Sequence, residues 1–265
     1  MNIESTGLIY FSPTQTTKKV IEGIAQGLQA ASSQYFDLTF PDANAQARQE
    51  FTQDLAIIGA PVYSGRLPSV MLSRFKRIKG NGRPAVIVVV YGNRAYEDAL
   101  VELRDIAVEA GFKPIAAGAF IGEHSYSTSD LPIASGRPDT QDIGKAQAFG
   151  KAIHKKIMAV AGKPGELLQA PGNFPYKEIQ MLSGIAPSVN EVLCLRCGKC
   201  AIVCPTTAID KENPVRTAKD LCIRCCACVK VCPGNARLLD DPRIKQAAER
   251  LYANCRSRKE PETYL

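Results

Sequence analysis

Apolar runs and amphipathic segments alternate along the first 160 residues of the chain. The apolar runs with the length and composition of buried strands are residues 7–11, 35–38, 55–59, 85–91 and 115–121. Between them, apolar residues recur at helical spacing, as at Val20, Ile24 and Leu28. This βαβα alternation predicts an α/β domain, a doubly wound parallel sheet of five strands with helices on both faces.

The pattern changes after residue 160. Residues 161–190 are rich in glycine and proline, which is typical of a linker, but apolar residues such as Leu168 and Ile179 predict that it packs along a domain. Near the end of the chain, Ile244, Ala248 and Leu251 follow helical spacing and predict a C-terminal helix. We therefore expect a first domain at 1–160, a packed linker at 161–190, a small domain at 191–240, and a helix and tail at 241–265.

The small domain carries one cysteine pattern written twice. Each run has the form C-x2-C-x2-C-x3-C-P, and each cysteine of the second run lies 28 positions after its counterpart in the first. Two such runs in register indicate two cubane iron–sulfur clusters. The eight candidate metal ligands are Cys194, Cys197, Cys200, Cys204, Cys222, Cys225, Cys228 and Cys232.

The double run resembles that of bacterial two-cluster ferredoxins. The resemblance implies that each cluster takes three cysteines from one run and the last cysteine of the other, so that Cys204 and Cys232 cross between clusters. Zinc held by four cysteines is the alternative metal, and a disulfide framework is a weaker one, because cysteines this close cannot staple a fold. Cys226 replaces the glycine of the first run and is interpreted as a bystander, and Cys255 as a small buried residue of the C-terminal helix.

Charge and composition restrict the function further. The formal net charge is +7, but basic residues are dispersed, and two oxidised clusters of about −2 each lower the total to about +3. A solvated surface is therefore favoured over nucleic-acid binding. No apolar run reaches the roughly 18 residues of a membrane span, and no secretory signal is visible. Thiolate-bound clusters fit a reducing compartment, so we expect a cytoplasmic protein.

A turn rich in hydroxyl groups follows the first predicted strand. Such a turn at the start of a helix offers hydroxyls and free N–H groups to a phosphate, and it lacks the Gly-Lys-Ser/Thr ending of nucleoside triphosphatases. It is similar to the flavodoxin phosphate loop, Ser/Thr-x-Thr-Gly-x-Thr, with an additional hydroxyl at Thr16 and Gln15 in the usual place of glycine. The candidate cofactor-binding residues of this loop are Ser12, Thr14, Gln15, Thr16 and Thr17.

Two further loops are similar to the flavodoxin loops that lie against the flavin ring. They follow the third and fourth predicted strands, and each offers glycine for close backbone approach and tyrosine for stacking. The candidates are Pro61, Val62, Tyr63, Ser64 and Gly65 in the first loop, and Tyr91, Gly92, Asn93, Arg94 and Tyr96 in the second. The resemblance covers the whole first domain and implies that this domain binds FMN. The predicted architecture is a flavodoxin-like domain fused to a ferredoxin-like domain that holds two 4Fe-4S clusters.

The loop at residues 122–139 is long for a connection between a strand and a helix, and such loops are often lids or docking surfaces. It contains His124, which we interpret as a polar loop residue because no nucleophile and carboxylate join it in a catalytic set. We therefore assign no catalytic residue. Three functions stay open: an electron carrier serving a redox partner protein, a flavin-dependent reductase of a small substrate fed by the clusters, and a redox-responsive binding protein.

Overall fold

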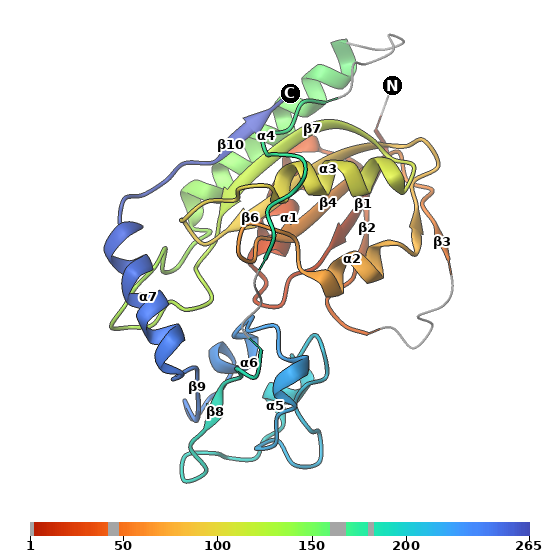
Figure 1. Ribbon diagram of the computed structural model, residues 1–265. Coiled ribbons are helices and arrows are strands. Elements are labelled where there is room, and N and C mark those ends of the chain that lie inside the picture. The colour runs from red at the N-terminus through yellow and green to blue at the C-terminus, as the bar shows by residue number, and fades with distance from the viewer. Residues whose placement is uncertain (1–2, 42–47, 160–167, 180–182) are drawn as a thin grey trace.

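The computed structural model describes residues 3–41, 48–159, 168–179 and 183–265. Figure 1 shows a large α/β domain above a small cysteine-rich domain, with helix α7 (Pro242–Asn254) running alongside both. From the end of α7 the tail returns to the upper domain. None of the helices in these described ranges is long and apolar enough to span a membrane.

Five parallel strands form the body of the main sheet. They are β1 (Ser5–Tyr10), β2 (Ser32–Asp37), β4 (Leu55–Pro61), β6 (Pro84–Tyr91) and β7 (Lys113–Ile121). Their order across the sheet is β2-β1-β4-β6-β7, which is the flavodoxin-like order of a doubly wound fold. The predicted α/β class and the five predicted strands are confirmed, and each observed strand starts or ends within a few residues of its expected position.

A sixth strand extends this sheet beyond the predicted five. Strand β10 (Glu262–Tyr264) comes from the C-terminal tail and pairs antiparallel with β7, with Thr263 opposite Gly118. Three residues carry no detectable alternation, so nothing local marks this strand in the sequence. The free edge of β7 supplies the hydrogen-bonding groups that order it.

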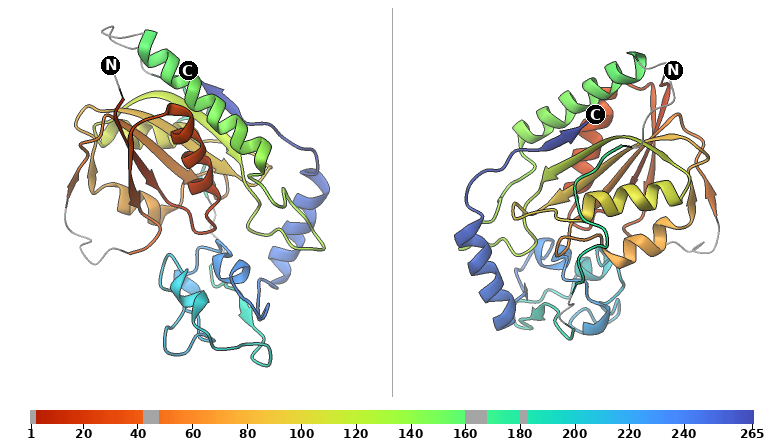
Figure 2. Two further views of the ribbon diagram at one scale, coloured as in Figure 1. Left: turned by 180° about the vertical axis from the view of Figure 1, so that it is seen from behind. Right: turned by 45° about the horizontal axis from the view of Figure 1, so that its top comes forward.

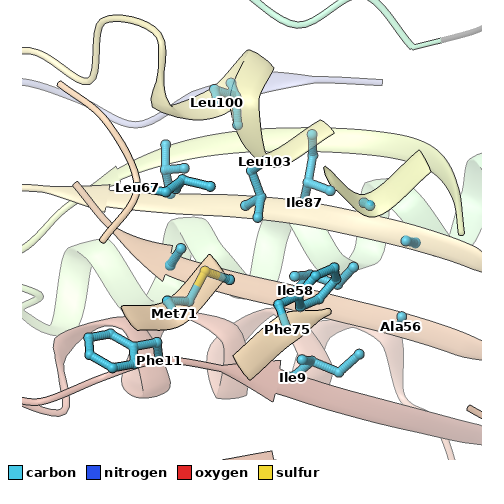
Figure 3. Close-up of a cluster of buried hydrophobic side chains, with 14 of the residues drawn as sticks. Ile9, Phe11, Ala56, Ile58, Leu67, Met71, Phe75, Ile87, Leu100 and Leu103 are labelled. Carbon is cyan, nitrogen blue, oxygen red and sulfur yellow. The ribbon is translucent and has the colours of Figure 1, made fainter. Parts of the chain in front are cut away.

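Helices cover both faces of the sheet (Figure 2). The face with α1 (Thr16–Leu28) and α4 (Thr140–Ala159) buries Ile24 and Phe149. The other face carries α2 (Ser69–Phe75), which the sequence analysis missed, and α3 (Ala99–Glu109). Figure 3 shows the core on that side, where Phe75 and Leu103 point toward strand residues such as Ile58.

Glycines bring α1 and α4 unusually close. A Cβ at Gly27 would lie 2.0 Å from the carbonyl oxygen of Gln147, and one at Gly150 would lie 2.1 Å from that of Ile24. Backbone of one helix therefore fills the space where the other would carry a side chain. This contact holds the last turns of α1 against α4.

The cysteine-rich domain consists of short elements. Strand β8 (Ser188–Val189) pairs antiparallel with β9 (Arg237–Leu238), the short helices are α5 (Lys199–Ile202) and α6 (Ala227–Lys230), and a 3-10 turn covers Lys219–Leu221. A second small pairing, in the upper domain, joins β3 (Gln49–Glu50) to β5 (Ile78–Lys79) in parallel.

The described part of the linker lies along α3. Two backbone N–H groups, of Asn173 and Lys177, donate to the carboxylate of Asp98 at 2.8 and 2.7 Å, and the Tyr176 hydroxyl donates to Asp105 at 2.5 Å. Residues 160–167 and 180–182 lie outside the described residues, so the predicted packing of these parts of the linker stays a prediction. The domain boundaries stay predictions.

Candidate functional site

The cysteines of the two runs line two separate small cavities. One is lined by three cysteines of the first run and the last cysteine of the second. The other is lined by three cysteines of the second run and the last cysteine of the first. The first set is Cys194, Cys197, Cys200 and Cys232, and the second set is Cys204, Cys222, Cys225 and Cys228. The structure thus brings together the crossed sets that the ferredoxin resemblance implies.

The backbone around the two sets repeats with the sequence. Left-handed residues recur 28 positions apart, at Gly198 with φ 71° and at Cys226 with φ 58°. Backbone N–H groups donate to the sulfur of each crossing cysteine, from Ala208 to Cys204 at 3.3 Å and from Ala236 to Cys232 at 3.2 Å. Such bonds favour a thiolate, because they place positive charge at the sulfur.

The donor set fits iron–sulfur clusters. Desolvation by burial raises the pKa of Cys225 and of Cys228 to about 12, so thiolates at these positions require a bound cation to exist near neutral pH. All ten cysteines are free of disulfides. Each crossed set brings four cysteines to one cavity, and a cubane binds one thiolate on each of its four irons.

The two remaining cysteines differ from each other. Cys226 is buried, starts α6, and its thiol donates to the Arg224 carbonyl oxygen at 3.6 Å. It lines the second cysteine cavity without belonging to the crossed set. Cys255 was expected on the apolar face of the C-terminal helix, but α7 ends at Asn254, and Cys255 is a partly buried cap residue. The prediction for Cys255 was wrong because the helix stops one residue earlier.

A much larger cavity, of about 550 Å³, lies at the carboxyl ends of the parallel strands. This end of a doubly wound sheet is where ligands bind in such folds, and the volume is that of an ordinary small-molecule site. The predicted cofactor-binding residues that line it come from all three loops. They are Thr14, Thr16, Pro61, Val62, Tyr63, Ser64, Tyr91, Gly92 and Arg94.

The phosphate loop keeps the shape that glycine normally provides. Gln15 adopts a left-handed conformation, with φ 64°, and both its backbone N–H and its side-chain Nε2 donate to the Ser12 carbonyl oxygen, at 3.1 and 3.0 Å. The Ser12 hydroxyl in turn accepts the Lys18 N–H at 3.1 Å. Ser12 and Gln15 therefore build the turn without lining the cavity.

One buried hydroxyl in this loop lacks a partner. The Oγ1 atom of Thr17 is buried and has no hydrogen-bond partner among the described residues. A buried unpaired hydroxyl costs about 1–3 kcal/mol. Thr14 and Thr16, on the same turn, line the cavity, whereas the predicted residue Thr17 does not. This set of hydroxyls at the start of a helix suits an anionic group such as a phosphate.

Three other predicted residues contribute to the frame of the site. The Asn93 amide donates to the carbonyl oxygens of Cys255 and Ser257, at 2.7 and 2.9 Å. The Tyr96 hydroxyl donates to Glu262 at 2.8 Å, and its ring lies 5.5 Å from that of Tyr91. The side chains of Asn93 and Tyr96 thus hold the C-terminal tail, and Gly65, a left-handed residue with φ 83°, shapes its turn. None of the three lines the cavity.

The sequence analysis missed the opposite wall of the cavity. That wall comes from the long loop at residues 122–126, from Lys177 and Ile179 of the linker, from Ile223 and Arg224 of the cysteine-rich domain, and from α7. In the sequence, only the unusual length of the loop at residues 122–139 pointed to a part of this wall. The remaining segments are distant in sequence and meet only in the folded chain.

His124 belongs to this wall. Its Nδ1 accepts the Tyr126 N–H at 3.0 Å, so the neutral ring carries its proton on Nε2. Burial, and then the neighbouring Lys230 and Arg94, lower the pKa of His124 to about 4. At neutral pH it is therefore an uncharged hydrogen-bond donor in the cavity wall, where the sequence analysis expected only a polar loop residue.

Comparison with known proteins supports the cluster domain. Residues 186–233, which include all eight repeat cysteines, match the family described as a 4Fe-4S dicluster domain. The chain therefore contains a 4Fe-4S segment fused to a flavodoxin-like sheet domain. No curated protein matches the chain.

Solved structures resemble about three fifths of the chain. A flavodoxin from the domain Archaea is 12% identical, over 58% of this chain and 99% of that one, with a TM-score of 0.39. A flavodoxin from Streptococcus pneumoniae is 16% identical, over 57% and 99%, with a TM-score of 0.40. A flavodiiron core from Synechocystis is 14% identical, over 60% and 37%, with a TM-score of 0.43. Because these scores are below 0.5, the fold assignment rests on the strand order.

Proposed function

We propose that this protein is an electron carrier that passes electrons between FMN, two 4Fe-4S clusters and a redox partner protein. The observation that carries this proposal is the position of the 550 Å³ cavity. It lies at the ligand-binding end of a flavodoxin-like sheet, and the 4Fe-4S domain itself contributes part of its wall. A flavin bound there would lie beside the cysteine loops.

FMN fits the residues that line the cavity. Thr14 and Thr16 would donate to the phosphate, and Tyr63 and Tyr91 would lie near the ring. Arg94 adds positive charge at the wall, although it also pairs with Glu97 at 2.6 Å. A bound flavin accepts one or two electrons and so connects one-electron clusters to two-electron donors or acceptors.

The two crossed cysteine sets would hold the clusters. The N–H bonds to Cys204 and Cys232 and the burial of Cys225 and Cys228 are the means by which this chain would tune their potentials. The donor and the acceptor belong to the redox partner and are not fixed by the cysteine spacing. A reducing cytoplasm remains the compartment we propose, because thiolate-bound clusters persist there.

A reductase of a small substrate is the second candidate, and one observation favours it. Residues 122–126 of the long loop form part of the cavity wall, and the neutral ring of His124 lies in this wall. A substrate held between this loop and a bound flavin would be screened from water. Steady turnover of a small molecule without any protein partner would favour the reductase over the carrier.

The cofactor content tests the proposal directly. We would purify the full chain without oxygen, record its visible spectrum, and measure iron, sulfide, zinc and flavin per chain. About eight irons, matching sulfide and one FMN are expected for two cubane clusters and one flavin site. Zinc without sulfide would overturn the cluster assignment, and iron without flavin would leave the upper domain as a docking module. Strong binding of DNA that weakens with salt would instead favour the redox-responsive binding protein.

A further inference from the structure

We propose that the two cysteine sets form an ordered relay, with one repeat turned to the flavin cavity and the other to a partner protein. The set with Cys225 is the inner one, and the set with Cys197 is the outer one, where a small acidic one-electron carrier docks. This inference rests on the proposed function. It adds the order of the centres and the surface at which electrons are exchanged.

The pair Ile223 and Leu195 carries the first step, because the two residues occupy the same position in the two repeats. Ile223 lines both the inner cysteine cavity and the 550 Å³ cavity, and it packs against the core of the sheet domain. Leu195, 28 positions earlier, lines only the outer cavity and is 69% exposed. The same loop position therefore faces the flavin site in one repeat and solvent in the other.

The neighbouring positions follow the same division. Arg224 lines the flavin cavity, whereas its counterpart Arg196 lies at the outer cavity with its side chain 60% exposed. Cys225 is 7% exposed, whereas its counterpart Cys197 is exposed. Two of these three consecutive positions thus line the large cavity in the second repeat and the third is buried, whereas all three counterparts in the first repeat are exposed.

The inner set, which includes the crossing Cys204, is also the one attached to the sheet domain. Arg74 of α2 donates to the carbonyl oxygen of Pro205, next to the crossing Cys204, at 2.6 Å. Lys230 of α6 forms an ion pair with Glu123 of the long loop. These contacts hold the inner set at a fixed place beside the cavity.

The outer set has no wall from the sheet domain. Its cavity is lined only by residues of the cysteine-rich domain, among them two exposed cations, Arg196 and Lys199, and no carboxylate. Glu191 reaches Arg196 only at 3.5 Å on the exposed rim. Two exposed apolar side chains, Val192 at 94% and Leu195 at 69%, lie three positions apart in the same loop. An apolar centre with basic neighbours complements an acidic carrier with an apolar docking face.

The chemistry of exchange requires no bond to form or break. A reduced carrier would give up one electron, which a cluster held by the outer cysteine set would take up. A cluster held by the inner set would then pass that electron to a flavin in the large cavity. Because one-electron transfer slows steeply with distance, a carrier docked at the exposed outer loop would reduce the outer cluster first.

The ligand variants Cys197→Ser and Cys225→Ser test the order in the holoprotein, with an acidic plant-type ferredoxin as the carrier. In Cys225→Ser, the remaining outer cluster should still be bleached by the reduced carrier at the wild-type rate, while the flavin stays oxidised. In Cys197→Ser, cluster bleaching by the carrier should fall at least about tenfold. The opposite pattern would overturn the order.

Surface variants test the docking face without touching a ligand. Arg196→Glu with Lys199→Glu should slow reduction by the carrier about tenfold or more at low salt, and the difference should vanish at high salt. The matched control is Lys151→Glu with Lys155→Glu on α4, which makes the same charge change on exposed residues of the sheet domain. Equal slowing by both pairs would overturn the docking face.

A third comparison remains decisive if a cysteine variant loses both clusters. Ile223→Ala should shift the absorption spectrum of bound FMN and weaken FMN binding severalfold, and Leu195→Ala, at the same repeat position, should change neither. Equal effects of the two variants would overturn the order. Failure of the proposed function looks different, because the wild-type chain would then lack iron, sulfide or flavin from the outset.

Discussion

Asn93 donates from its amide nitrogen to the carbonyl oxygen of Cys255 at 2.7 Å, across 162 positions of the chain. The same nitrogen reaches the Ser257 carbonyl oxygen at 2.9 Å, and the Asn93 side chain is almost completely buried. This residue therefore ties the end of α7 to the loop that follows β6. Since α7 contributes Ala247 and Leu251 to the large cavity, the tie also holds one wall of that cavity in place.

Asn93→Ala should destabilise the protein by about 1–3 kcal/mol, because two carbonyl oxygens lose their donor in a partly buried place. It should also weaken FMN binding, since α7 is then less firmly held. Chemical denaturation and flavin titration measure the two effects. Asn254→Ala is the control, because the Asn254 amide donates only to the exposed Arg250 carbonyl within α7. If both variants lose the same stability, the tie has no special role.

His124 should make stability depend on pH in a defined window. Its pKa is lowered to about 4 in the fold, below the ordinary value of about 6.5, so the unfolded chain binds a proton that the folded chain does not. Its contribution is fully present above pH 6.5 and is lost as the pH falls toward 4, by at most about 3 kcal/mol.

The measurement is denaturation of wild type and His124→Gln at several values of pH, together with an NMR titration of the ring. The wild type should lose more stability than His124→Gln between pH 6.5 and pH 4. His154→Gln is the control, because His154 lies on α4, away from the cavity. A His124 ring that titrates near its ordinary value would contradict this prediction.

Gln15 holds a left-handed conformation that costs a non-glycine residue about 1 kcal/mol. Gln15→Gly should therefore preserve FMN affinity and change stability by no more than about 1 kcal/mol, the relief of strain being offset by the lost side-chain bond to Ser12. Gln15→Val should weaken both, because a β-branched residue tolerates this conformation poorly.

Flavin titration measures the FMN affinity of both Gln15 variants, and thermal unfolding measures their stability. Gln29→Gly is the matched control, since Gln29 has φ 59° at the other end of α1. It should alter stability alone. A large loss of FMN affinity in Gln15→Gly would show that the side chain, and not the backbone shape, matters for binding.

Thr17 carries a buried hydroxyl without a partner among the described residues. Thr17→Val should therefore leave the flavin-free protein as stable as wild type, or more so, because the unpaired hydroxyl is removed. If that hydroxyl donates to a bound phosphate, FMN affinity should fall by about tenfold, corresponding to one lost hydrogen bond of about 1.4 kcal/mol. Thr17→Ser, which keeps the hydroxyl, should bind FMN like wild type. Unchanged affinity in Thr17→Val would place the phosphate elsewhere.

Local patterns in the sequence were sufficient to predict the main strands and the buried face of α1. Strands such as 85–91 are continuous apolar runs because both faces of a parallel sheet are buried, and α1 shows its stripe because only one face of it is. The crossed cysteine grouping was also expected, from the resemblance to two-cluster ferredoxins, and the left-handed backbone at Gly198 and Cys226 repeats with the same 28-residue spacing. These features depend on residues that are neighbours along the chain.

Short elements and long-range contacts were beyond such reasoning. Strand β10 exists because β7 offers a free edge, and nothing in its three residues announces it. Asn93 and Tyr96 have the residue types expected of a flavin loop, yet the returning tail occupies their polar groups. Residue type alone does not say which of several partners a side chain meets.

The sequence by itself determined the kinds of centre this chain can hold, through the paired cysteine runs and the three loops after the strands. The tertiary structure alone decided how they are arranged. It placed Ile223 in the wall of the large cavity and left its counterpart Leu195 in solvent, although the two residues occupy the same position of the repeat. The physical reason is that the repeated sequence sets the local backbone of each loop, whereas packing against the sheet domain decides which of the two loops is buried and which is exposed.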